Sequence, residues 1–231
     1  MLAVAVTIFV SFENDACQKA RLLASSQEES GYWLGALPST SLGLCLDNDS
    51  LRIAVALRLG AKICNTHNCK CGKKVDEFGH HGTVREDGKR PDGLTLTPWS
   101  HGKCLLWDAT CGDTLAKSYV KQTSRDVGWV ARTAEQDKIS HYSSLLSQYH
   151  FIPLGFETLG PWGPHCKKFV SDLGKRISEL THEKRATLYL KQRLSIDVQR
   201  GNAISVLNTL PSTSSLEEVF YLISKKKTNF L

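Results

Sequence analysis

Two aspartates flank a pair of alternating segments in the middle of the chain. Asp92 lies in the run Lys-Arg-Pro-Asp-Gly at 89–93, and Asp108 closes the run Cys-Leu-Leu-Trp-Asp at 104–108. Apolar and polar residues alternate in both segments, and Pro98 and Gly102 lie between them, a pattern that predicts a β-hairpin. Opposite residues of a hairpin share a face, so we expect Asp92 to lie opposite Asp108. The same register predicts two apolar pairs on that face: Leu94 with Leu106, and Leu96 with Cys104.

Two carboxylates this close resist joint ionisation unless a cation lies between them. Hard oxygen ligands favour Mg²⁺ or Mn²⁺, metals that activate water and stabilise charge on a phosphoryl group. For Asp92 alone a structural role is the alternative, because Asp in Pro-Asp-Gly commonly caps a turn. Asp108 follows two leucines and a tryptophan, and a buried carboxylate there needs a partner or a metal.

A second group of candidate ligands precedes the hairpin. It comprises Cys64, Cys69, Cys71 and His81, with His80 as the alternative histidine. Tetrahedral zinc takes four nitrogen or sulfur ligands, which these residues could supply. Their spacing is irregular and contains no two Cys-x-x-Cys halves, so a zinc site and free thiols both remain open.

The composition is that of a folded, basic chain. It has 231 residues, 41% of them hydrophobic, and a formal net charge of +6. The basic excess lies in residues 61–231, where we expect a polyanion to bind: DNA, with RNA as a second candidate. Three of the eight cysteines crowd beside a histidine, which favours an intracellular protein, nuclear or cytoplasmic, over a secreted disulfide protein. The apolar first ten residues lack a basic lead and are too short to cross a bilayer, so we expect no membrane partner.

Hydrophobic periodicity predicts the remaining elements. Asp47 is a candidate N-cap and Gly60 a candidate end for a helix between them. Other helices are expected over 13–30, 126–148, about Glu183–Gln199 and Asn202–Leu210, with a strand over 151–159. A further helix is expected to carry Phe169, Val170, Leu173, Ile177 and Leu180 on one face.

The order of the short motifs carries a resemblance. A Cys-x-Cys-Gly knuckle with Gly-x-His-Gly is followed by Arg-Pro-Asp-Gly, by Trp-Asp-x-Thr and by Ala-Glu-x-x-Lys-x-x-x-Tyr at 134–142. Glu-Thr-Leu-Gly-Pro-Trp-Gly at 157–163 and Gln-Arg-Gly-Asn-Ala at 199–203 complete the series. Over about residues 20–210 the chain resembles the C-terminal part of non-LTR retrotransposon reverse-transcriptase polyproteins that carry a restriction-like endonuclease of the PD-(D/E)XK type.

The resemblance implies an α/β fold, a restriction-endonuclease-like mixed sheet flanked by helices, with an N-terminal helical segment and a Cys/His knuckle. It implies that Asp92 and Asp108 hold Mg²⁺ or Mn²⁺ and that Lys138, displaced onto a helix, stabilises charge or orients water. A solvated helix lysine is the alternative for Lys138. The expected divisions are a linker segment at 1–60, the knuckle at 61–84, the endonuclease core at 85–210 and a C-terminal linker with a basic tail at 211–231.

The chain departs from the family pattern just before the hairpin. His-Gly-Thr-Val at 81–84 runs at once into Arg-Glu-Asp-Gly at 85–88, where the family has a further cysteine, a basic segment and a core helix. This predicts an internal deletion, and no polymerase palm is present, so reverse-transcriptase activity is not expected. Two functions remain: a metal-dependent endonuclease that nicks DNA, and a non-catalytic relic that binds nucleic acid or a partner.

Overall fold

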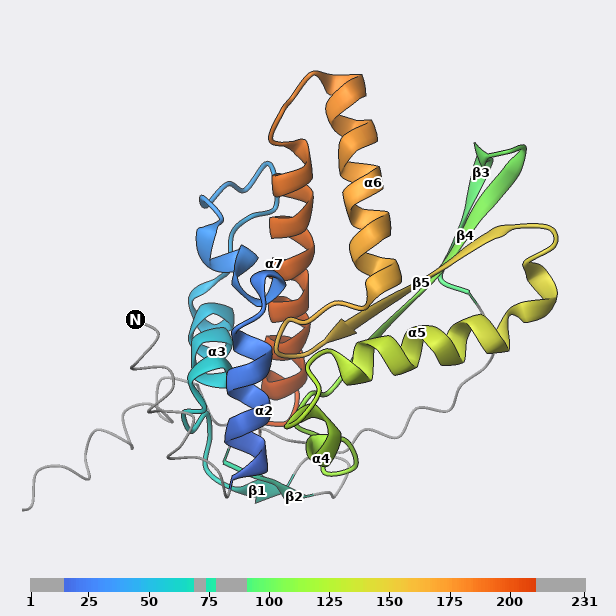
Figure 1. Cartoon of the computed structure of the whole chain (residues 1–231). Coiled ribbons are helices and arrows are strands. Elements are labelled where there is room, and N and C mark those ends of the chain that lie inside the picture. The colour runs from blue at the N-terminus through green and yellow to red at the C-terminus, as the bar shows by residue number, and fades with distance from the viewer. Residues whose placement is uncertain (1–14, 69–73, 78–90, 211–231) are drawn as a thin grey trace, which may run out of the picture. The chain divides into compact units, whose positions relative to one another are not determined.

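The structure is a computed structural model that describes residues 15–68, 74–77 and 91–210 (Figure 1). These residues fall into two units, 15–44 with 91–198, and 45–68 with 74–77 and 199–210. The grouping differs from the expected divisions, because residues 15–44 pack with the hairpin region whereas 199–210 pack with the helix that follows Asp47. None of the helices in the described ranges is both long and apolar enough to cross a bilayer.

The first unit is a mixed α/β structure built on three strands. β3 and β4 form the predicted hairpin, and β5 lies parallel to β4 on its other side, in the order β3-β4-β5. The strand bounds are Gly93–Ser100 for β3, Lys103–Gly112 for β4 and His150–Glu157 for β5. The helices of this unit are α2 (Ala16–Ser25), η1 (Glu28–Gly35), α4 (Val120–Thr123), α5 (Trp129–His141), η2 (Ser143–Leu145), α6 (Pro164–Thr181) and the first part of α7 (Ala186–Leu207).

Helices cover the two faces of this sheet (Figure 1). α5 lies so close to one face that a Cβ on Gly112 would meet Val130, and one on Gly155 would meet the backbone of Ala131. α6 packs on the other face, where Phe156, Trp162, Cys166 and Val170 form a buried cluster. Side chains alternate along a strand, so this arrangement decides which β4 residues face which helix.

The hairpin register is partly as predicted. Leu94 pairs with Leu106, but Pro98 instead of Leu96 pairs with Cys104, because extra residues bulge out of β3. Proline has no N–H to give to the ladder, and Thr95 compensates for the irregularity: its Oγ1 accepts from the Leu105 amide at 2.9 Å.

The second unit packs around the predicted helix α3 (Asn48–Leu59). Asp47 caps it by accepting from the Ser50 amide at 2.9 Å, and Gly60 ends it in the left-handed conformation, φ 68°. A short antiparallel pair, β1 (His67–Asn68) with β2 (Lys74–Val75), and the end of α7 complete the unit. Its buried core comprises Ile53, Ala56, Ile63, Cys64, Val75, Ala203, Val206 and Leu210.

Candidate active site

Asp108 lies in the middle of β4 on the face covered by α5. It is buried, with 3% of its surface exposed. The Lys138 ammonium donates to its Oδ2 at 2.7 Å. Lys138 is itself only partly buried, with 30% of its side chain exposed, so the pair joins a buried carboxylate to a cation that reaches solvent.

Lys138 reaches Asp108 because of its place on α5. It follows Glu135 by three residues, a spacing that puts both side chains on the same side of a helix. Glu135 is 1% exposed and contacts the sheet, so this side of α5 faces β4 and β5. The interpretation of Lys138 as a solvated helix lysine therefore does not describe its position.

Asp92 lies immediately before β3 and is exposed. Its backbone N–H donates to the carbonyl of Trp107 at 3.1 Å, and its Oδ2 accepts from the Ala109 amide at 2.7 Å. The carboxylate thus rests against the peptide bond that follows Asp108. Gly93 pairs with Trp107, and continuing this register by one residue brings Asp92 beside Asp108, as the sequence predicts.

The glycine of Arg-Pro-Asp-Gly has a steric role in this arrangement. A Cβ on Gly93 would lie 2.0 Å from the Trp107 indole, a separation that real atoms do not reach. The indole lies against the Gly93 backbone, and this close contact holds the start of β3, with Asp92, against β4.

The two aspartates offer a donor set that suits a hard divalent cation. In the described part of the chain, the Asp92 bond to the Ala109 amide and the Asp108 bond to Lys138 both use Oδ2. Among residues 15–68, 74–77 and 91–210, no three His, Cys, Asp or Glu side chains come together as a metal site. Mg²⁺ is commonly held by one or two carboxylates, with waters and substrate phosphates as its other ligands, so the pair fits that ion.

Two buried glutamates escaped the sequence reasoning. Glu157, 0% exposed at the end of β5, accepts at Oε1 from the amides of Val130 and Ala131 at 3.0 and 3.3 Å, and at Oε2 from the Thr114 hydroxyl at 3.0 Å. It therefore caps the first turn of α5. The sequence feature that could have identified Glu157 is its position at the end of an apolar strand, where a buried carboxylate needs hydrogen-bond donors.

Glu135 has the corresponding role for α6. Its Oε1 accepts from the amides of Cys166 at 2.9 Å and Gly155 at 3.2 Å, and its Oε2 from the amide of His165 at 3.0 Å. A Cβ on Gly163 would collide with this carboxylate, so glycine is required where α6 begins. Both glutamates are held by backbone donors in a closed environment and are structural.

Burial raises the pKa of Glu157 above its usual value. The bonds from the Ala131 amide, the Thr114 hydroxyl and the Val130 amide, together with the positive charge of Arg132, act in the opposite direction and favour the ionised form. The net direction is upward because this carboxylate is completely removed from water.

The zinc prediction remains a prediction. Cys64 is buried in the core of the second unit, and its Sγ donates to the carbonyl of Asp76 at 3.3 Å. Cys69, Cys71 and His81 lie outside the described residues. Measuring the zinc content of the purified protein would test whether the four predicted ligands bind one metal ion.

No protein-family model, no curated protein and no solved structure matches this chain. The arrangement of Asp92, Asp108 and Lys138 is consequently interpreted from its own geometry. That geometry is a carboxylate pair at the start of a hairpin with an ammonium bonded to its buried member.

Proposed function

We propose that the chain is a metal-dependent endonuclease that hydrolyses phosphodiester bonds in DNA. The observation that carries the proposal is the 2.7 Å contact between the buried Asp108 carboxylate and Lys138, beside the Asp92 carboxylate. A carboxylate pair with an adjacent ammonium is a donor set suited to phosphoryl chemistry.

Each residue has a distinct task in this proposal. Asp92 and Asp108 would hold Mg²⁺ or Mn²⁺, which when bound supplies a nucleophilic water and neutralises charge on the phosphoryl group. Lys138 contributes a positive charge beside the phosphate, where negative charge develops during hydrolysis. Asp108 also fixes the position of that ammonium, because the carboxylate is held by β4 and cannot move away.

Three structural features support the proposal. The sheet is mixed and flanked by helices, both acids belong to one hairpin, and the lysine lies on the helix between that hairpin and the next parallel strand. The restriction-like endonuclease pattern has the same order of residues. The expected deletion falls on residues 78–90, outside the described residues.

A nicking assay with supercoiled plasmid tests the proposal. Wild type should convert plasmid to the nicked form with Mg²⁺ or Mn²⁺ and lose this activity in EDTA, because the metal supplies the water. Asp108→Asn should abolish nicking, since the amide keeps the shape but weakens metal binding. Asp137→Asn, an exposed position on α5, makes the same chemical change away from the site and should leave nicking intact.

Lys138→Met is the second informative variant. It removes the ammonium while keeping most of the apolar stem, so the turnover rate should fall by about 10²–10³-fold, the usual effect of removing one charge-stabilising donor. Equal nicking by wild type, Asp108→Asn and Lys138→Met would assign the activity to a contaminant and refute the proposal.

The non-catalytic alternative is favoured by one feature of the same pair. Lys138 neutralises the buried Asp108, so the two side chains satisfy each other as a structural ion pair would. Under this alternative wild type does not nick with either metal, and Asp108→Asn lowers the free energy of unfolding without changing the affinity for DNA. Urea unfolding and DNA titrations of the same two proteins separate the two functions.

A further inference from the structure

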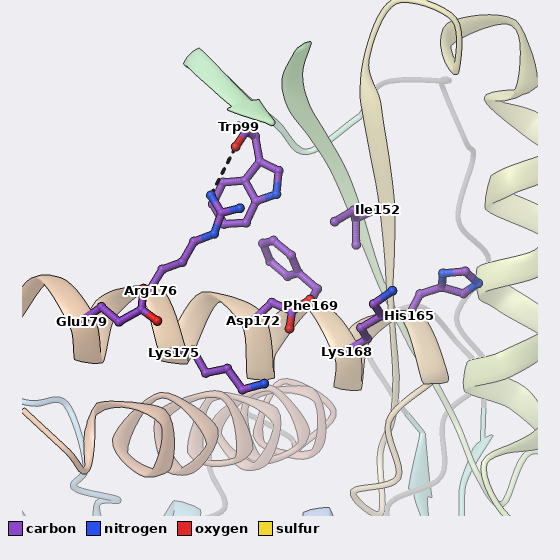
Figure 2. Close-up of a pocket in the computed structure, with 9 residues that line it drawn as sticks. All are labelled: Trp99, Ile152, His165, Lys168, Phe169, Asp172, Lys175, Arg176 and Glu179. Carbon is purple, nitrogen blue, oxygen red and sulfur yellow. Dashed lines mark hydrogen bonds between the residues drawn. The ribbon is translucent and has the colours of Figure 1, made fainter. Parts of the chain in front are cut away.

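A groove unrelated to the aspartate pair lies between the hairpin and α6 (Figure 2). Two adjoining hollows of about 450 and 460 Å³ share Trp99, Ile152, Lys168, Asp172 and Arg176, and together they form one open channel. We call this channel the Trp99 groove.

A stack of flat groups stands at the centre of the groove. The Arg176 guanidinium lies 3.8 Å from the centroid of the Trp99 ring, and its Nη1 donates to the Trp99 carbonyl at 3.2 Å. Phe169 approaches Trp99 with ring centroids 5.7 Å apart and an angle of 51° between the planes. Arg176 itself is exposed, so the stack presents a flat, cationic, pre-ordered surface to solvent.

Cations line the α6 side of the groove. Lys175 and Arg176 follow Lys168 by seven and eight residues, about two turns of the helix, so the three lie along one side of α6. Neither Lys168 nor Lys175 makes a hydrogen bond or ion pair with any residue in the described part of the chain. Asp172 lies between Lys168 and Lys175, and Glu179 lies one turn beyond Arg176, so the three cations and two carboxylates give the α6 wall a formal charge of +1.

Two lysines without partners, beside the half-buried Trp99 ring and the exposed Arg176 guanidinium that covers it, suit a ligand that carries both phosphates and flat bases. The groove is open along its length, which fits an extended chain better than an enclosed small molecule. Stacking requires an unpaired base, because bases in a duplex already stack on each other. The negative charges of Asp172 and Glu179 restrict the positions where phosphates can lie.

We propose that the Trp99 groove binds single-stranded nucleic acid, with bases stacked on Trp99 and Arg176 and phosphates held by Lys168 and Lys175. This goes beyond the proposed nuclease and does not rest on it. The groove faces α6, whereas Asp108 faces α5, on the opposite side of the sheet. The two sites share strands: Ile152 in the groove wall pairs with Trp107, the neighbour of Asp108.

Fluorescence anisotropy with labelled oligothymidine and oligouridine of about 16 nucleotides tests the proposal, the length being the upper end of single-domain site sizes. Titrations in EDTA exclude any contribution from metal-dependent chemistry. Wild type should bind at low salt, and affinity should fall steeply as salt rises. Trp99→Ala should weaken binding about five-fold or more, the usual effect of losing one stacking partner.

The paired substitution Lys168→Ala with Lys175→Ala tests the phosphate contacts. Both side chains are without partners in the described residues, so the fold should survive, and the salt slope should fall by about 0.7 for each lost contact. Lys117→Ala with Lys121→Ala removes the same charge from exposed positions outside the groove and should leave the slope unchanged. Because these titrations are made in EDTA, where metal-dependent nicking does not occur, their result does not depend on whether the nuclease proposal holds.

The outcomes decide the proposal and the source of the ligand. Tighter binding of oligothymidine assigns the groove to DNA strands, and tighter binding of oligouridine assigns it to RNA; both support single-strand binding. Equal losses in the groove and control lysine variants overturn it, as does a preference for duplex DNA over either single strand. If Trp99→Ala proves unfolded by circular dichroism, the lysine variants decide alone.

Discussion

Three carboxylates on the α5 face of the sheet are buried, and they are satisfied in two different ways. Glu135 and Glu157 are enclosed by backbone amides, which cannot leave without unfolding a helix end. Asp108 is instead bonded to a side chain that reaches solvent. A cation can displace or join a lysine at the surface, so of these three Asp108 is the carboxylate suited to chemistry.

Glu157→Gln tests how burial acts on a single carboxylate. Burial raises the pKa of Glu157, so the folded state binds its proton more tightly than the unfolded state. The stability that Glu157 contributes is therefore complete below its ordinary pKa of 4.5 and decreases as pH rises through the higher folded value. The free energy of unfolding of wild type, relative to Glu157→Gln, should fall as pH rises above 4.5 in urea titrations.

The matched control is Glu179→Gln, an exposed carboxylate on α6 that makes the same change in net charge. A difference between wild type and Glu157→Gln that grows with pH would contradict the assigned direction. It would mean that the helix amides and the Thr114 hydroxyl outweigh desolvation.

The sequence pattern pointed to the residues of the candidate site more readily than to the buried glutamates that hold the surrounding helices in place. The relation of Asp92 to Asp108 follows from alternation within one hairpin, and Lys138 entered through the motif order. Glu157 was not assigned a role because its donors, Val130, Ala131 and Thr114, are far from it in sequence and are brought to it only by the packing of α5 on β5.

At the level of elements, backbone conformation explains which predicted helix ends and strand registers agree with the structure and which do not. Gly60 ended α3 as predicted, because it takes a left-handed conformation that favours glycine. Gly201 did not end a helix: α7 continues through it to Leu207 as one helix where two were expected. The hairpin register held near Leu94 but shifted at Pro98, since a pattern of residue types does not reveal a bulge.

Gly201→Ala should stabilise the protein. Gly201 is exposed within α7, and nothing lies within 4 Å of the position that a Cβ would take. Alanine loses less backbone freedom on folding than glycine, so the free energy of unfolding should rise by about 0.5–1 kcal/mol, measured by chemical denaturation.

The same substitution at Gly174 in α6 should have the opposite effect. A Cβ there would lie 2.8 Å from the backbone Cα of Thr187, which cannot move without shifting α7. We expect a loss of about 1–3 kcal/mol, the usual cost of overpacking. Equal effects of the two variants would show that helix propensity alone, without the α6–α7 contact, determines both.

At the level of the whole molecule, the two units have separate cores, and they differ in their content of tryptophan, the main fluorescent residue. All five tryptophans lie in residues 15–44 and 91–198, so tryptophan fluorescence reports on the first unit alone. Far-ultraviolet circular dichroism reports on the helices of both units. Chains with more than one core often unfold in more than one step, and these two signals would reveal it.

Ile53→Ala tests whether the units unfold independently. Ile53 is 0% exposed in the core of the second unit, and its truncation should cost that unit about 2–5 kcal/mol. We expect the dichroism transition to move to lower denaturant or to split, while the fluorescence midpoint stays where it is in wild type. A joint shift of both signals would show that the units unfold as one.

The buried glutamates also determine which parts of the first unit can open separately. Glu157 of β5 holds the start of α5, and Glu135 of α5 holds the start of α6 and the Gly155 amide of β5. Opening any one of these elements alone would leave a carboxylate or several amides buried without partners. Strand β5 and the two helices therefore depend on one another for their hydrogen bonds. We expect their amide hydrogens to exchange with solvent as a single cooperative unit.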